Sequence, residues 1–211
     1  ELFSIMSYSF AILTKTWPIL FILPILKKIK NKKNLSLIFL FPLTFVITYG
    51  INFGSNFLDI IKTPFTYRSL FSFWGLGKFI HLIFFRDQFQ PPIYAQKIFL
   101  GIFLIIFFIY SLKINYKNLI IYFFDILLFF YIFTFGFSIQ YFSWFIPFLF
   151  LIKPKSWCFI YLVTFLTVSI NYLSWLSNFI NNFIIIIIIF LNWLCFIFFL
   201  IYWKNKGFKS K

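Results

Sequence analysis

The sequence predicts an all-α protein, a polytopic transmembrane bundle of about seven membrane segments with an amphipathic external loop. Two observations predict this fold. Of the 211 residues, 63% are hydrophobic and 39 are Phe, which excludes a soluble domain with the usual share of charge. Apolar runs close to the roughly 20 residues that cross a bilayer recur along the chain, and lysines gather in every second connection. A transmembrane barrel is excluded, because its short strands would alternate in polarity.

The seven expected segments follow from the apolar runs and from the charges or turns that end them. They cover residues 5–26, 35–53, 93–112, 119–135, 141–152, 157–172 and 183–203. The first, third, fifth and seventh end in lysines, whereas the second leads into the long loop 54–92. The fourth and sixth end in the uncharged turns 136–140 and 173–182. We treat the whole chain, 1–211, as a single transmembrane domain.

The distribution of basic residues predicts the orientation of these segments. Thirteen of the 19 Lys and Arg residues follow the odd-numbered segments, and none lies in the two uncharged turns. Basic loops stay in the cytoplasm, so we expect loop 54–92 outside. The fifth segment is short for a span. If it formed one bent unit with the fourth, the later segments would change sides, but the charge pattern argues against that alternative.

The net charge of +15 is explained by this topology and does not indicate a nucleic-acid partner. Cys158 and Cys195 lie in apolar runs and are expected to act as small hydrophobic residues. No cofactor and no metal site are predicted. Because the chain begins at Glu1 inside an apolar run, we expect it to be the C-terminal part of a larger membrane protein.

The external loop is the first candidate for function. Residues 57–62 and 67–85 place large apolar side chains beside basic ones, which is typical of a helix lying in the membrane interface with its basic groups toward phosphate headgroups. A surface loop without a functional role explains the pattern equally well. His81, the single histidine, is more simply an interfacial residue than a base or ligand.

Two charges fall inside expected membrane segments, where a charge is costly and faces a cavity or a partner. Lys15 precedes Pro18 and Pro24, which would bend the helix and open a cavity for a substrate phosphate. Alternatively, Lys15 reaches the interface or pairs with Asp125. For Lys15 we favour the functional interpretation, and for Asp125 the structural one.

The turn before the fifth segment, residues 137–148, groups amide, phenol, hydroxyl and indole donors at the external end of a helix. Aromatic faces and amides are suited to sugars, and Gln140, Tyr141 and Trp144 are the candidates there. An aromatic belt at the headgroup level is the alternative.

Three motifs in this order resemble one family. Lys15-Thr16-Trp17-Pro18 is similar to the Lys-x-x-Pro helix of GT-C membrane glycosyltransferases, including glycosylphosphatidylinositol mannosyltransferases and bacterial polyprenyl-phosphate-mannose-dependent mannosyltransferases. Tyr67-Arg68-Ser69 with Trp74-Gly75 resembles the Tyr-x-Ser and Trp-Gly stretch of the bacterial members. Residues 138–147 resemble their Ser-Pro-Gln-Tyr-x-x-Trp-x-x-Pro segment, with Ile139 where Pro is usual.

The resemblance implies an inverting transferase that takes a sugar, typically mannose, from a polyprenyl-phosphate donor at the external face. It implies that Lys15 and Arg68 contact the donor's phosphate, and that membrane lipid and this donor are the partners. The family's catalytic base is an Asp in an upstream external loop. Asp59 and Asp87 match no such motif, so no catalytic residue is assigned. The expected location is the bacterial plasma membrane, or the endoplasmic reticulum of a eukaryote.

Two other functions remain open at this point. A transporter or flippase would also use broken helices and charges at the membrane midplane, although no inverted repeat is evident. A polymerase or ligase of surface polysaccharide would use the same lipid-linked substrates in a different reaction.

Overall fold

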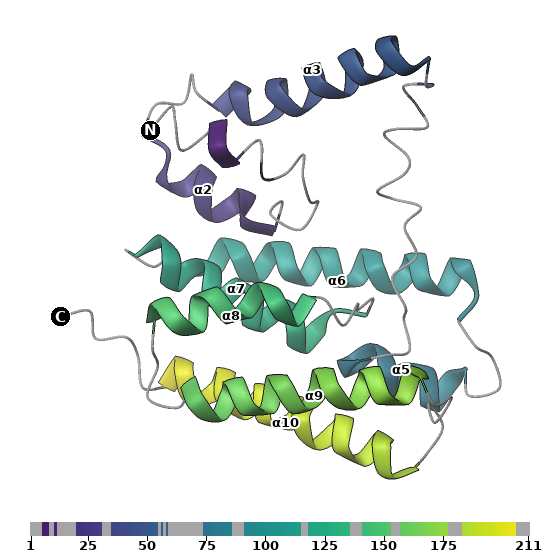
Figure 1. Ribbon diagram of the computed structural model, residues 1–211. Coiled ribbons are helices and arrows are strands. Elements are labelled where there is room, and N and C mark those ends of the chain that lie inside the picture. The colour runs from purple at the N-terminus through teal and green to yellow at the C-terminus, as the bar shows by residue number, and fades with distance from the viewer. Residues whose placement is uncertain are drawn as a thin grey trace. The chain divides into compact units, whose positions relative to one another are not determined.

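The computed structural model is all-helical in the part that it describes (Figure 1). This part comprises residues 6–8, 11, 20–30, 35–54, 56, 58, 74–85, 91–114, 118–135, 141–152, 157–176 and 183–205. Its main helices are α2 Ile22–Lys28, α3 Leu35–Phe53, α5 Gly75–Phe84, α6 Ile93–Lys113, α7 Leu119–Phe133, α8 Phe142–Ile152, α9 Trp157–Leu176 and α10 Phe183–Asn205. The all-α prediction is confirmed for these residues.

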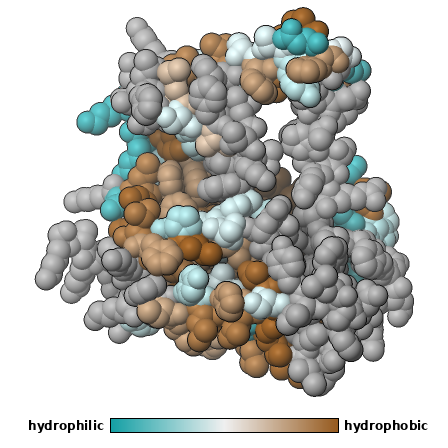
Figure 2. Space-filling view, viewed as in Figure 1, coloured by the Kyte–Doolittle hydropathy of each residue, from teal (hydrophilic) through white to brown (hydrophobic). Residues whose placement is uncertain are grey.

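Among the described helices, three are long and apolar enough to cross a membrane, judged by length and composition. They cover Ser36–Phe53, Ile93–Lys113 and Ile186–Asn205, within α3, α6 and α10. Helices α5, α7 and α8 and the stretch Cys158–Ile170 of α9 are apolar but shorter. The three long helices indicate a membrane protein that is helical in its described part, and apolar side chains cover much of the described surface in Figure 2.

The chain divides into two compact units, Glu1–Arg68 and Ser69–Lys211. The first unit contains α2 and α3. Helix α2 ends at Lys27 and Lys28, where cations oppose the negative end of the helix dipole. Helix α3 is apolar on all sides and carries Pro42 in its interior, and most of its described side chains are exposed. A helix of that composition requires lipid or protein around it.

Helix α7 is the centre of the second unit. It contacts α5, α6, α8 and α10, and nearly every side chain from Ile121 to Ile132 is buried. Asn118 caps its first turn, because the Asn118 side-chain oxygen accepts a hydrogen bond of 2.9 Å from the backbone N–H of Ile120. Its core is aromatic: Phe124 stacks on Phe145 of α8 with ring centroids 4.8 Å apart.

Helix α6 packs on α7 through a narrow stripe. Its buried residues are Ala95, Phe103, Phe107 and Ser111, which are spaced by multiples of four and so lie on one face. Ring pairs join this stripe to α7, for example Phe103 with Phe130 at 5.9 Å. The rest of the helix exposes Ile, Leu and Phe side chains, as expected of a helix surrounded by lipid.

The cysteines behave as expected. Cys158 on α9 and Cys195 on α10 are free thiols within apolar helices.

Candidate functional site

The carbonyl end of α7 carries several polar contacts with other segments. The backbone N–H of Thr134 donates to the Phe130 carbonyl at 2.9 Å, which leaves the carbonyls of the last three helical residues without a partner in their own helix. Trp74 donates its indole N–H to the Tyr131 carbonyl at 2.8 Å, and Trp193 donates to the Ile132 carbonyl at 2.9 Å. Two indoles therefore cap α7 where water is scarce, and an unpaired carbonyl there would be costly.

Trp74-Gly75 can take up this position because residue 75 is glycine. Gly75 begins α5 with a φ of +58°, which is strained for any residue with a side chain. Its α-carbon also lies close to the α7 end: a β-carbon there would meet Trp193 Nε1 and the Tyr131 carbonyl oxygen, both at 3.4 Å. The Trp-Gly pair thus directs the indole of Trp74 into the bundle, where it is 1% exposed.

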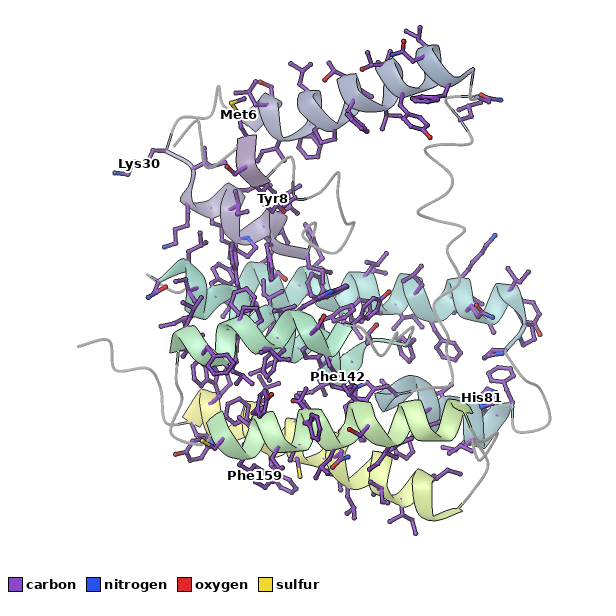
Figure 3. All side chains as sticks on the ribbon, viewed as in Figure 1. Met6, Tyr8, Lys30, His81, Phe142 and Phe159 are labelled. Atoms are coloured by element: carbon purple, nitrogen blue, oxygen red, sulfur yellow. The ribbon has the colours of Figure 1, made fainter. Side chains whose placement is uncertain are left out.

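Tyr131 connects this cap to the start of α8. Its hydroxyl donates a hydrogen bond to the carbonyl of Tyr141, one residue before α8. Its carbonyl, as described above, accepts from Trp74. Phe142, labelled in Figure 3, packs edge-on against Trp74 with ring centroids 4.9 Å apart. Segments 74–75 and 141–144, far apart in sequence, are therefore adjacent in space.

Tyr141 and Trp144 form an aromatic pair on this end of α8. Their ring centroids are 4.2 Å apart, and Phe130 of α7 lies within 6.3 Å of both rings. Both side chains are partly exposed, in contrast to the fully buried Phe142 and Phe145 beside them. The pair thus offers aromatic surface at the edge of the bundle, where a sugar ring or a lipid can be contacted.

Helix α5 has its polar face turned inward. Lys78 is 3% exposed and His81, labelled in Figure 3, is 8% exposed, whereas Ile83 and Phe84 are 70% and 69% exposed. The interfacial interpretation, with basic groups directed toward headgroups, is wrong for these two residues. When lipid surrounds the outer side of a helix, the free energy is lower with apolar side chains exposed and polar side chains buried. Burial also lowers the pKa of Lys78 below its ordinary value.

A second polar group, centred on Asp125 near the middle of α7, joins three helices. Asp125, completely buried, accepts hydrogen bonds at one carboxylate oxygen, Oδ2, from Lys204 Nζ at 2.7 Å and from the Tyr110 hydroxyl at 2.9 Å. The Lys204 ammonium also lies 4.9 Å from the centroid of the Tyr110 ring. No donor among the described residues reaches the other oxygen, Oδ1. The suggested pairing partner of Asp125, Lys15, lies outside the described residues, and Lys204 occupies that role.

The predicted site residues divide into two groups. Tyr141 and Trp144 are described and lie together at the carbonyl end of α7. Lys15, Arg68 and Gln140 lie outside the described residues. Within the described ranges, no three His, Cys, Asp or Glu side chains lie close enough to hold a metal ion.

Sequence reasoning missed the inward direction of Lys78 and His81 and the pairing of Lys204. A sequence signal for the inward polar face was present, because this face repeats at every third position, at Gly75, Lys78 and His81. No local sequence signal exists for the ion pair, because Asp125 and Lys204 are 79 residues apart.

Comparisons with known proteins add no family to this description. No protein-family model matches the chain. The searches of curated proteins and of solved structures likewise found no significant match.

Proposed function

We propose that this chain belongs to a membrane glycosyltransferase that moves a sugar, most simply mannose, from a polyprenyl-phosphate donor to an acceptor at the external face. The proposal includes seven membrane segments, with loop 54–92 and the Tyr141 end of the bundle outside. Among the described helices, α7 to α10 contact one another in sequence, as short connections between antiparallel spans require.

One observation carries the proposal. The two motif segments at 74–75 and 141–144 meet through Tyr131, which accepts from Trp74 and donates to Tyr141. A transferase needs its donor-binding and sugar-binding segments on one side of the membrane, and this contact supports such a site. The partly exposed Tyr141–Trp144 pair supplies aromatic surface of the kind that sugar rings contact.

The test is transfer of mannose from polyprenyl-phosphate-mannose by membranes that contain the natural protein. Gln140→Leu is expected to lower the rate roughly tenfold or more, because losing a buried polar contact to the sugar costs about 1–3 kcal/mol. Trp144→Leu is expected to lower the rate as well, because it removes half of the partly exposed aromatic pair. Tyr94→Leu is the matched control, since Tyr94 is an exposed aromatic residue on α6. Near wild-type transfer by both test variants would reduce this surface to an aromatic belt.

A transporter or flippase of a lipid-linked or anionic substrate is the second candidate. The buried Asp125 carboxylate, paired with the partly exposed Lys204, favours it, because charges held inside helical bundles often belong to transport pathways. Proteoliposomes containing the purified protein distinguish the two. Movement of polyprenyl-phosphate-mannose across the bilayer without sugar transfer supports the transporter, and transfer in the presence of acceptor supports the enzyme.

A further inference from the structure

The inner face of α5 presents an unexplained positive charge. Lys78 lies on this short helix with its side chain 3% exposed, and α5 packs on α7 and α10. A lysine usually extends its ammonium group to water while its methylenes remain in apolar surroundings. At 3% exposure Lys78 does not do so. Placing an ammonium group in such surroundings is costly unless an anion accompanies it.

The described part of the protein provides no such anion near α5. Asp125 is the single carboxylate side chain among the described residues, and its Oδ2 binds Lys204 and Tyr110. It is also distant from the α5 contact. Trp74 meets α7 at Tyr131, six residues further along the helix, which corresponds to about 9 Å along the axis.

The buried face of α5 is polar in composition. Its buried residues within α5 are Gly75, Gly77, Lys78 and His81, so two of four have no side chain and the other two can donate hydrogen bonds. Apolar packing of α5 on α10 comes from Phe79, whose ring lies 4.8 Å from that of Phe190 and 5.1 Å from that of Trp193, whereas Ile83 and Phe84 are exposed. Polar side chains that face the interior of a membrane bundle commonly mark a binding site.

We propose that the inner face of α5, with Lys78 and His81, binds the phosphate group of a membrane lipid. Phosphate is the anion that a lipid environment supplies, and a lysine ammonium binds it as a point charge while a histidine ring adds a directional N–H donor. Lys78 is the main determinant, and His81, three residues later on the same face, orients the group. The site requires a lipid-borne phosphate but no sugar, so it extends the proposed function by naming a phosphate-binding face.

The experiment measures binding of a fluorescent polyprenyl phosphate to the purified full-length protein in nanodiscs of neutral phosphatidylcholine. Polyprenol, which has the same chain without the phosphate, is the matched ligand control. Wild-type protein is expected to bind the phosphate at least tenfold more tightly than the alcohol. Lys78→Met should abolish that preference and leave polyprenol binding unchanged, because methionine preserves the apolar length of the side chain. Lys97→Met, at an exposed lysine of α6, is the control variant and should retain the preference.

Two further arms identify the source of the phosphate and protect the test from misfolding. In the first arm, unlabelled phosphatidic acid and unlabelled polyprenyl phosphate compete with the fluorescent probe. Equal displacement by the two lipids assigns the site to phospholipid headgroups, whereas weak displacement by phosphatidic acid assigns it to the polyprenyl lipid. Lys78→Arg, which keeps the charge, should recover at least part of the preference. Equal binding of phosphate and alcohol by the wild-type protein, or a full preference in folded Lys78→Met, would overturn the proposal. Failure of mannose transfer with this binding intact would instead overturn the proposed function alone.

Discussion

Lys204 Nζ lies 2.7 Å from Oδ2 of Asp125, although the two residues are 79 positions apart and belong to different helices. Asp125 is completely buried and the Lys204 side chain is 33% exposed. The pair therefore lies at the margin of the bundle, with the carboxylate inside and the ammonium partly outside. Tyr110 completes it from α6, so one carboxylate oxygen joins α6, α7 and α10.

Lys204→Met is expected to destabilise the protein by about 2–4 kcal/mol, because it leaves the Asp125 charge buried without its cation. The lower limit reflects the partial exposure of Lys204. The double variant Asp125→Leu with Lys204→Met should recover most of the loss, since no unpaired charge remains. Unfolding of the purified protein in detergent measures both. A double variant as unstable as the single one would show that the pair contributes more than charge compensation.

Tyr110→Phe is expected to cost about 1.5 kcal/mol, the lower end of the range for a hydrogen bond to a charged group, because the site is partly exposed. The ring itself remains, and it stacks on Phe129 with centroids 3.9 Å apart, so little packing is lost. Tyr94→Phe on the same helix is the control. Tyr94 is exposed, and its loss of a hydroxyl should leave the unfolding midpoint unchanged. Equal effects of the two variants would contradict the assignment.

Gly75→Ala and Gly101→Ala are expected to act in opposite directions. Gly75 has a positive φ, so alanine there costs about 1–2 kcal/mol. Gly101 lies in the middle of α6 with nothing within 4 Å of an added β-carbon, so alanine should stabilise that helix by roughly 0.5–1 kcal/mol. The comparison of unfolding midpoints checks both. If Gly75→Ala were neutral, the left-handed start of α5 would not be a constraint.

The burial of Lys78 predicts that the free energy of unfolding depends on pH. Burial lowers its pKa in the folded state, so the unfolded chain binds the proton more readily. Stability therefore rises with pH between the lowered pKa and the ordinary pKa of about 10.4, and the cost of burying the charge is greatest below this window. Lys78→Met should accordingly stabilise the lipid-free protein most at neutral pH, with the gain vanishing as the pH approaches 10.4. Unfolding curves of both proteins across this range provide the measurement. A constant difference at every pH would exclude titration of Lys78 as its cause.

Cysteine accessibility tests the orientation of the membrane segments. In a variant with Cys158 and Cys195 replaced by serine, a cysteine introduced at Ser55 should react with a membrane-impermeant reagent in intact cells. A cysteine introduced at Ser210 should react only after the membrane is opened. Labelling of position 210 from outside would reverse the map. The expectation depends on the lysine clusters, since basic connecting segments remain in the cytoplasm.

The positions of helices could be predicted closely from the sequence. Apolar runs end where charge or turn residues begin, and α3, α7 and α10 start at the residues expected, 35, 119 and 183. These boundaries are local properties of the chain. A run long enough to cross a membrane also predicts helix, because lipid leaves backbone groups no other partner.

The candidate site was predicted only in part, for physical reasons. Tyr141 and Trp144 stand close in sequence and at the start of one helix, so their proximity was expected. The contact of Trp74 with Tyr131 depends on how α5 docks, which no local pattern specifies. The side to which the polar face of α5 turns was mistaken, because a mixed apolar and basic stretch fits either a membrane interface or the inside of a bundle. Which of the two applies depends on what surrounds the helix.

The narrow contact stripe of α6 divides its residues between two kinds of constraint. On the stripe, Phe103 and Phe107 fit against particular rings of α7, so even a change of apolar size leaves a gap or a clash. On the outer side, Ile102, Ile105 and Phe108 are exposed, and any apolar residue there can contact a lipid chain. Substitutions among Ile, Leu, Val and Phe can therefore accumulate on that side over evolution while function is retained. Sequence constraint on α6 is therefore expected mainly along its contact stripe with α7.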